Sequence, residues 1–357
     1  MAVALLWMTT GTAAGGRQGS VRPAAPPVKL SIELNGDLLI HSPLWQQALR
    51  YGHGNYDFVP MLREVAPYVR AADLAICHVE TPMTPRPPHG YPVFNTPTQL
   101  ARAISATGWD ICDTASNHSL DQGQYGIDQT GLALDRAGVR HTGSFPSAAA
   151  QRRTLIVTVK GVRVAFLAYT EMLNGFMPPH SWSVNPARIA DVRRDARVAR
   201  RRGAQVVIVN FHWGTEFQSA PSAFQLAVAH ALAGDPDITA IVGRHVHVVQ
   251  PIVRIGGEFV VYGEGNLLSN ETASCCPAAT QDGMLVFLHV VVRGRSSSVQ
   301  SVSYMPTWIR HPGYTVLPIG DAVRRHEAPA GVLHASYART VSVVGHRPGV
   351  LDPIRQR

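Results

Sequence analysis

Five short polar clusters, each at the end of an apolar run, constrain the fold of this chain more than any other feature. In chain order they are Asn35-Gly36-Asp37, His78-Val79-Glu80, Ser116-Asn117-His118, Asn210-Phe211-His212 and Gly243-Arg244-His245-Val246-His247. The apolar runs before them are predicted strands, and helical patterns alternate with those strands, which is typical of layered α/β proteins. In an open α/β sheet, ligands bind at the carboxyl ends of the strands. The clusters are therefore predicted to meet at one edge of a sheet.

Periodic apolar patterns and turn residues place the remaining elements. Helices are expected over 60–72, 97–107, 124–137, 187–202 and 221–233. Thr96-Pro97 reads as a helix start, with Thr96 as the cap and proline at the first helical position. Hairpins are expected where Lys160-Gly161 and Gly256-Gly257 separate pairs of apolar runs. No glycine-rich nucleotide-binding motif is present in the sequence.

Length and hydrophobicity predict one large domain. The chain has 357 residues, of which 45% are hydrophobic and 16% charged, as in an ordinary globular protein. The domain is expected over residues 28–310, after a leader and linker at 1–27 and before a C-terminal extension at 311–357. No run of about 18 apolar residues encodes a complete transmembrane helix.

The N-terminal residues and the cysteines bear on location. Apolar residues 2–8 precede a small, glycine-rich stretch, which resembles a secretory signal without its basic start. We expect export to the cell envelope or beyond it; a tail without a signal would leave the protein cytoplasmic. Four cysteines are too few for a disulfide scaffold. Cys77 and Cys112 are expected as buried thiols or as a neighbouring pair.

The net charge of +8 at pH 7 comes almost entirely from arginine. A basic surface suits an anionic polymer or a phosphoester, although an arginine-rich surface can also be merely solvated. The densest run, Arg193 to Arg202, is expected to be a solvated helix face. Nucleic acid is an unlikely partner, because no aromatic residues are interleaved with this run.

The five clusters contain a donor set for two divalent metal ions around an activated water. Asp37 and His247 are the predicted ligands of the first metal, and Glu80 is predicted to bridge. Asn117, His212 and His245 complete the second metal. Mixed nitrogen and oxygen donors favour Mn, Fe or Zn over Ca or Mg.

Other polar residues near the clusters have two interpretations each. His118 is predicted to face the cleft as a general acid, and Asp121 either orients its imidazole or caps the next helix. Glu216 and His41 are candidates for contacts with substrate or with a metal ligand, or else surface residues. Asn266 is a further candidate, in a Gly265-Asn266 turn. His78 is expected to be a satisfied core histidine and not a ligand.

The combined motifs over residues 29–270 resemble the CapA family of poly-γ-glutamate capsule synthesis, within the calcineurin-like metallophosphatase superfamily. The resemblance is carried by phrases at the five clusters and beyond them: Val79-Glu80-Thr81-Pro82, Ser116-Asn117-His118-Ser119-Leu120-Asp121, His212-Trp213-Gly214-Thr215-Glu216, Gly243-Arg244-His245-Val246-His247 and Tyr262-Gly263-Glu264-Gly265-Asn266. It implies a four-layer α/β/β/α sandwich and a role in making, exporting or anchoring an anionic polyamide at the cell envelope. The chain departs from the family pattern at His78, Ser116 and Val246, where asparagine, asparagine and proline are usual. These changes spare the metal-ligand positions but leave the identity of the polymer open.

Three functions compete at this point. The first is an envelope hydrolase that cleaves a phosphoester or amide with metal-bound hydroxide. The second is a non-catalytic accessory subunit of a membrane-bound capsule synthase complex. The third, a nucleic-acid phosphodiesterase, has the least support.

Overall fold

The computed structural model describes residues 2–4, 8, 11 and 26–354. The leader and linker expected over 1–27 therefore lie almost entirely outside the described residues. Among the described residues, no helix is both long and apolar enough to cross a membrane.

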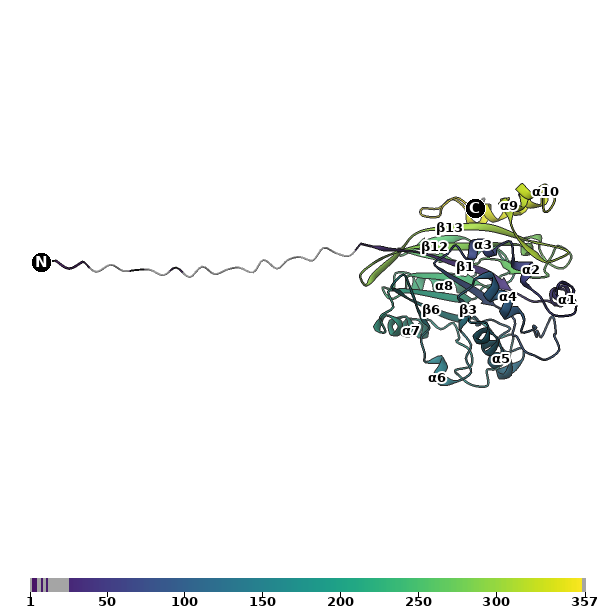
Figure 1. The fold of residues 1–357 in the computed structure, drawn as a ribbon, viewed down its shortest axis with the longest axis horizontal. Helices are drawn as coiled ribbons and strands as arrows, with labels where there is room; N and C mark the ends of the chain where they lie inside the picture. Colours follow the sequence, from purple (N-terminus) through teal and green to yellow (C-terminus); the bar gives the residue numbers. More distant parts are fainter. Residues whose placement is uncertain (1, 5–7, 9–10, 12–25, 355–357) are drawn as a thin grey trace.

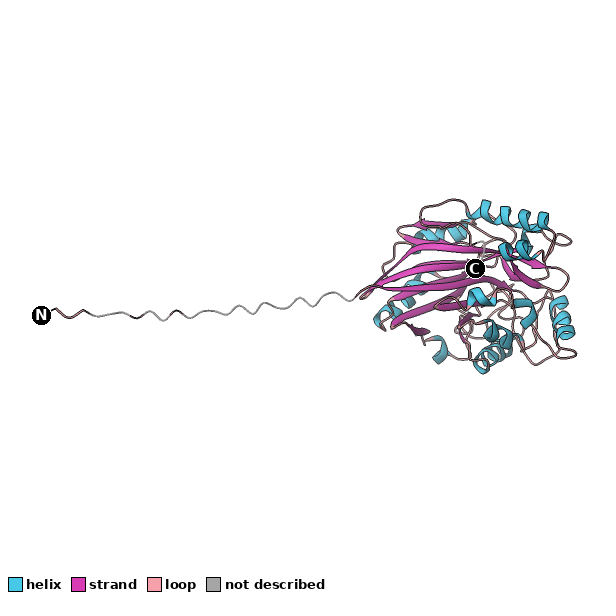
Figure 2. Ribbon diagram, turned by 45° about the horizontal axis from the view of Figure 1, so that its top comes forward, coloured by secondary structure: helices cyan, strands magenta, loops and turns pink. Residues whose placement is uncertain are grey.

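Two β-sheets form the centre of the molecule (Figure 2). The first sheet has the order β14-β13-β12-β1-β2-β3-β4, with β11 pairing to β1; the second has the order β5-β6-β7-β8-β10-β9. The strands of the first sheet are β1 (Val28–Leu38), β2 (Leu74–Val79), β3 (Ile111–Asp113), β4 (Arg140–Thr142), β11 (Asn266–Leu268), β12 (Asp282–Arg293), β13 (Ser296–Arg310) and β14 (Thr315–Pro318). Those of the second are β5 (Ile156–Val159), β6 (Val162–Thr170), β7 (Val206–His212), β8 (Ala240–Arg244), β9 (Ile252–Ile255) and β10 (Glu258–Val261).

The sheets pack face to face, and helices cover their outer faces (Figure 1). Alternate residues of β1, such as Ile32 and Leu34, share one core with Phe166 and Ile208 of the second sheet. The helices over the first sheet are α1 (Ser42–Tyr51), α2 (Val59–Leu62), α3 (Ala66–Val69), α4 (Leu100–Thr107) and α5 (Gly123–Arg136). The second sheet is covered by α7 (Ile189–Arg201) and α8 (Ala223–Leu232). The predicted four-layer α/β/β/α sandwich is confirmed.

Two local predictions were wrong. The helix expected over 60–72 is split into α2 and α3, because Pro67 has no N–H to continue the hydrogen-bond ladder. Thr96 does not cap α4, which begins at Leu100; its hydroxyl lies 2.8 Å from that of Thr81 instead. Helix α1, with Pro43 in its first turn, was not anticipated.

The C-terminal residues, for which the sequence predicted no elements, complete the first sheet. Strand β14 pairs with β13, and α9 (Ile319–Arg325) and α10 (Ala330–Val344) pack beside this pair. Arg339 of α10 donates two hydrogen bonds, of 2.6 and 2.9 Å, to buried Asp282. A short helix, α6 (Ala148–Gln151), precedes β5, and its Ser147 hydroxyl accepts a hydrogen bond from the Ala150 N–H.

Candidate functional site

The candidate site forms where the carboxyl ends of strands from both sheets meet. Asp37 lies near the end of β1, in register with His78 of β2 and with Asn266 of β11. The approach of β11 requires glycine at position 36, because a Cβ there would lie 1.8 Å from the Gly265 carbonyl oxygen.

The second sheet supplies the histidines. His212 ends β7, and His245 and His247 follow β8 directly. His245 and His247 adopt positive φ angles of 95° and 59°. Such angles are strained for residues other than glycine, and strain of this kind concentrates at functional sites. These two conformations hold both imidazoles in the polar cluster.

Glu80 is shared by two groups of donors that could each hold a metal ion. One group is Asp37, Glu80 and His247, and the other is Glu80, His212 and His245; within each group the donor atoms lie within 4.8 Å of one another. The fold brings together the side chains of the two predicted ligand sets, and Glu80 is common to both groups. Asn117 joins the second group, because its Oδ1 lies 2.9 Å from His212 Nε2.

The donor atoms fit a divalent cation chemically. Glu80 is 1% exposed, and neither of its carboxylate oxygens has a hydrogen-bond partner among the residues that the structure describes. A buried carboxylate without a partner is costly unless a cation neutralises it. The Nε2 atoms of His212 and His247 each lie 3.8 Å from Glu80 Oε1, and His245 Nδ1 also lacks a partner.

Burial and neighbouring charges shift the pKa values of these groups, and for His247 burial is outweighed by the attraction of Glu80 and other carboxylates, which raises the pKa well above its usual value. Burial raises the pKa of Glu80 well above its ordinary value, although His247 opposes the shift. Burial and neighbouring histidines lower the pKa of His212 well below its usual value and that of His245 to about 3. Neutral imidazoles are the form that binds metal. Burial also disfavours ionised Asp37, but its hydrogen bond and charge interaction with His247 outweigh burial and lower its pKa.

A buried polar layer beneath the donors was missed by sequence reasoning. Arg244 is fully buried; its Nε lies 3.1 Å from Glu264 and donates to the Asn35 carbonyl at 2.6 Å. Its Nη1 lies 3.2 Å from Asp113 Oδ2 and also contacts Asn210. Arg244 and Glu264 stand inside the motifs given above, but nothing local in the sequence showed that they would be buried together with Asp113.

His78 belongs to this polar layer. It is buried, as expected, but its Nε2 lies 3.1 Å from His212 Nδ1 and its Nδ1 lies 3.0 Å from Asp113. With Asp37 and His212, His78 forms another group with metal-ligand spacing. His78 is therefore part of the site and packs against a predicted ligand.

His118 and Asp121 form a pair at the rim. Asp121 Oδ2 lies 2.8 Å from His118 Nδ1 and also accepts a hydrogen bond of 2.7 Å from the Phe94 N–H. The Phe94 ring meets the imidazole edge to face, with centroids 4.7 Å apart. Asp121 does not cap α5, whose N-cap is Gln122 without a side-chain hydrogen bond. Of the two interpretations of Asp121, the geometry matches the one in which it orients His118.

The remaining three candidates occupy different positions. Asn266 Oδ1 lies 3.1 Å from His247 Nδ1, so Asn266 orients that imidazole. Glu216 is exposed, and its carboxylate is within ligand distance of the His245 and His247 donors. His41 accepts a hydrogen bond of 3.2 Å from the Asn270 N–H and packs edge to face on Phe94. Burial lowers the pKa of His41 to about 4.

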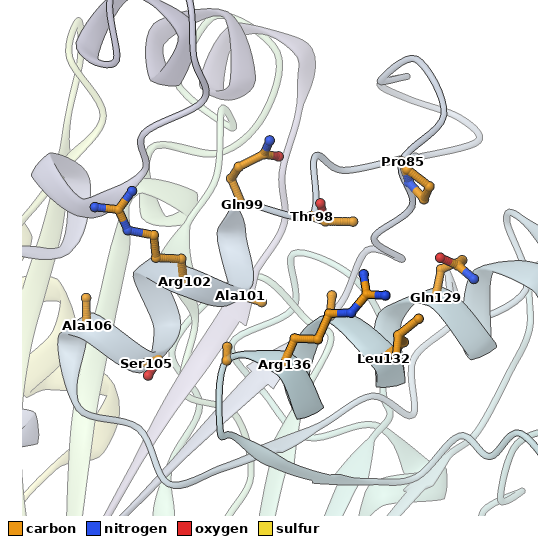
Figure 3. Close-up of a pocket in the computed structure, with 12 residues that line it drawn as sticks. Pro85, Thr98, Gln99, Ala101, Arg102, Ser105, Ala106, Gln129, Leu132 and Arg136 are labelled. Atoms are coloured by element: carbon orange, nitrogen blue, oxygen red, sulfur yellow. The ribbon is translucent and has the colours of Figure 1, made fainter.

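A cavity of about 610 Å³ lies apart from these residues, between α4 and α5 (Figure 3). Arginine, glutamine, alanine and leucine side chains line it, and no histidine or carboxylate does. Its size alone does not make it the functional site, because it holds none of the groups that metal or acid–base chemistry requires.

Comparison with known proteins identifies the family. Residues 31–271 match the family described as bacterial capsule synthesis protein PGA_cap. This chain belongs to the PGA_cap family. It is 28% identical over 273 residues to the capsule biosynthesis protein CapA of Bacillus anthracis, covering 73% of this chain and 64% of that protein. It is 25% identical over 240 residues to the PGA biosynthesis protein CapA of Bacillus subtilis, covering 64% of this chain and 61% of that protein. The PGA_cap chain thus spans somewhat less than two thirds of these relatives.

Solved structures support the fold. The calcineurin-like phosphoesterase YfkN of Bacillus subtilis superimposes with a TM-score of 0.50 at 14% identity, over 87% of this chain and all of that one. A phosphatase of Mycoplasma pneumoniae gives the same TM-score and identity over 80% of this chain and 96% of that one. The PGA_cap protein therefore has the two-sheet α/β architecture of calcineurin-like phosphoesterases.

Proposed function

We propose that this PGA_cap protein is a metal-dependent hydrolase of the cell envelope. Its substrate would be poly-γ-glutamate or a related anionic polymer, cleaved at an amide or phosphoester bond during synthesis or export. The observation that carries the proposal is Glu80, a buried carboxylate without hydrogen-bond partners that is shared by two groups of metal-ligand spacing. The CapA relatives, described as proteins of capsule or PGA biosynthesis, support the choice of polymer.

The residues divide into ligands and an acid. Asp37, Glu80 and His247 would hold one divalent ion, and Glu80, Asn117, His212 and His245 a second, with Mn, Fe or Zn suited to these donors. Bound ions would supply Lewis-acid activation of the scissile group and of water.

His118 acts through its Nε2 atom. Asp121 accepts the Nδ1–H, which fixes the ring orientation and leaves Nε2 free to donate a proton to the leaving group. Phe94 packs on the imidazole and, through its backbone N–H, also holds Asp121 in place. A purely structural metal site has no need of such a pair.

Location and partners follow as parts of the proposal. Cys77 and Cys112 form a disulfide, and disulfides persist mainly in oxidising compartments outside the cytoplasm. This supports an exported protein; as a further part of the proposal, the protein works beside a membrane-bound polymer synthase complex.

A second candidate function is that of a non-catalytic accessory subunit. It is favoured by a Mycobacterium tuberculosis relative, 28% identical over 180 residues, that is described as a probable polyglutamine synthesis accessory protein. In that case the metal would stabilise the fold, and His118 would be dispensable.

Metal analysis combined with turnover tests the proposal. Purified wild-type protein should contain about two transition-metal ions per chain, and the Asp37→Ala/His247→Ala variant should be depleted. His118→Ala should keep its metal but lose hydrolysis of γ-glutamyl oligomers and model phosphodiesters. His53→Ala, at an exposed histidine outside the site, is the matched control and should leave both unchanged. A wild-type protein that takes up no added Mn, Fe or Zn refutes the proposal, and full activity in His118→Ala refutes the assignment of the acid.

A further inference from the structure

A second concavity, of about 550 Å³, lies between α6, the start of β5 and one face of α7. It shares no lining residue with the metal centre. Figure 1 shows α6 and α7 on the same side of the second sheet. We refer to this concavity as the arginine groove, after the five arginines that line it: Arg152, Arg153, Arg188, Arg194 and Arg202.

The charge of the arginine groove is not balanced internally. Its carboxylates are Asp191 and Asp195, so five arginines against two aspartates leave a net charge of +3. Both aspartates are already engaged by Arg194, and Asp195 also accepts a hydrogen bond from Tyr169.

The four other arginines are available to a ligand. Arg152, Arg153, Arg188 and Arg202 are exposed, and none forms an ion pair within the described part of the chain. Within the described residues, the side chain of Arg202 makes one long hydrogen bond, of 3.4 Å, to the Thr154 hydroxyl. Arg152 and Arg153 follow α6, and Arg188 and Arg202 flank the two ends of α7, so the fold brings two separate segments of the chain together. Guanidinium groups suit carboxylates and phosphates, because their planar N–H donors match two oxygens of either group.

Three other arginines of the basic helix α7 interact with the protein itself, whereas Arg201 is exposed and lies outside the groove. Elsewhere on α7, Arg193 pairs with Asp235, Arg197 lies near Asp237, and Arg200 donates to backbone oxygens. Those side chains are neutralised or used by the protein itself. The expectation of a solvated helix face agrees with the exposure of Arg194 and Arg202, and the fold adds that both line the groove.

One loop connects the groove with the metal centre. The segment between β6 and α7 places Asn174 3.5 Å from His118 and, further along, places Trp182 and Arg188 in the groove lining. Trp182 stacks on His180, with ring centroids 4.4 Å apart, which gives the groove a rigid aromatic wall. A long ligand held in the groove would thus contact the loop that also borders the catalytic candidate.

We infer that the arginine groove is an exosite for an extended polycarboxylate chain. It binds successive carboxylates of the anionic polymer at a distance from the site of cleavage. This inference rests on the proposed function for the identity of the polymer, but not on hydrolysis. The buried carboxylates of the candidate metal centre repel a polyanion. Electrostatic attraction of a polyanion is therefore expected at the arginine groove.

Binding of a fluorescent γ-glutamyl decamer, measured by anisotropy, tests the inference. Working in EDTA removes metal-mediated binding, so the result does not depend on the proposed hydrolase activity. The Arg152→Gln/Arg188→Gln variant should bind roughly tenfold more weakly or worse, because each lost charge-assisted contact can account for about that factor. It should also show a shallower dependence on salt concentration. The matched control is Arg197→Gln/Arg201→Gln, which also removes two positive charges, but from α7 outside the groove. Its Kd for the decamer should stay within about threefold of that of wild type.

Two further measurements separate the inference from its competitors. The His118→Ala variant should bind the decamer as tightly as wild type, even if the proposed hydrolase activity is never detected. A γ-glutamyl dimer should bind much more weakly than the decamer, because it cannot reach several arginines. Equal losses in the groove variant and its control would overturn the inference, since they would indicate net charge alone. Tight binding of inorganic polyphosphate without binding of the decamer would overturn the assignment to carboxylates.

Discussion

The disulfide between Cys77 and Cys112 joins two neighbouring strands of the first sheet, so its loss should weaken both the fold and the site. The two cysteines face each other across β2 and β3, and the next pair in the register is His78 and Asp113 of the polar layer. The cross-link spans a sequence separation of 35 residues. For a loop of that length, the chain-entropy relation gives about 4 kcal/mol of stabilisation at 25 °C.

Urea unfolding followed by tryptophan fluorescence, with and without a reducing agent, measures this contribution without any substitution. Reduction should lower the free energy of unfolding by roughly the 2–4 kcal/mol typical of disulfides. The control is the Cys275→Ser/Cys276→Ser variant, which replaces the two free cysteines. Reduction should lower its free energy of unfolding as much as that of wild type. Unfolded, unreduced protein should expose only the two loop thiols. Four reactive thiols, or the same midpoint before and after reduction, would refute the reasoning.

Three further predictions concern a glycine, the metal and pH. Gly243→Ala should lower the free energy of unfolding by about 2 kcal/mol or more, because the new Cβ would lie 2.1 Å from Trp213 Nε1. Gly331→Ala is the control, since a Cβ there meets no atom within 4 Å. Equal unfolding midpoints of the two variants would contradict this prediction. Manganese at 100 times its Kd should stabilise wild type by about 2.7 kcal/mol. The same manganese concentration should stabilise the Glu80→Gln variant much less. An equal rise in the Tm of wild type and variant would exclude Glu80 as a ligand. Burial lowers the pKa of His311 from its ordinary value of 6.5 to about 4. Between these pH values the unfolded chain binds more protons than the folded chain, so the free energy of unfolding should fall as the pH decreases through that window. The His311→Gln variant should lose less stability over the same window. Identical pH profiles of stability for wild type and variant would contradict the assignment.

The sequence predicted those parts of the site whose signals are local. Apolar runs that end in polar clusters marked the strands carrying Asp37, His212 and His245, and a dinuclear donor set could be read from the residue types alone. Residues that act through long-range contacts were overlooked. Arg244 was quoted only as part of a motif, and nothing local showed that it would be buried against Asp113 and Glu264.

What the sequence by itself determined was the alternation of strands and helices, the family and the residue types of the candidate metal-donor set. These properties depend on the period of apolar residues and on side-chain chemistry, both of which are local. The tertiary structure alone decided that β1, β2 and β3 of one sheet would meet β7 and β8 of the other, which brings Glu80 between two histidine-containing groups. It also decided which arginines of a basic helix would be neutralised and which would line a groove. Sheet packing buries apolar surface without regard to separation along the chain, so contacts between distant segments exist only once the whole fold has formed.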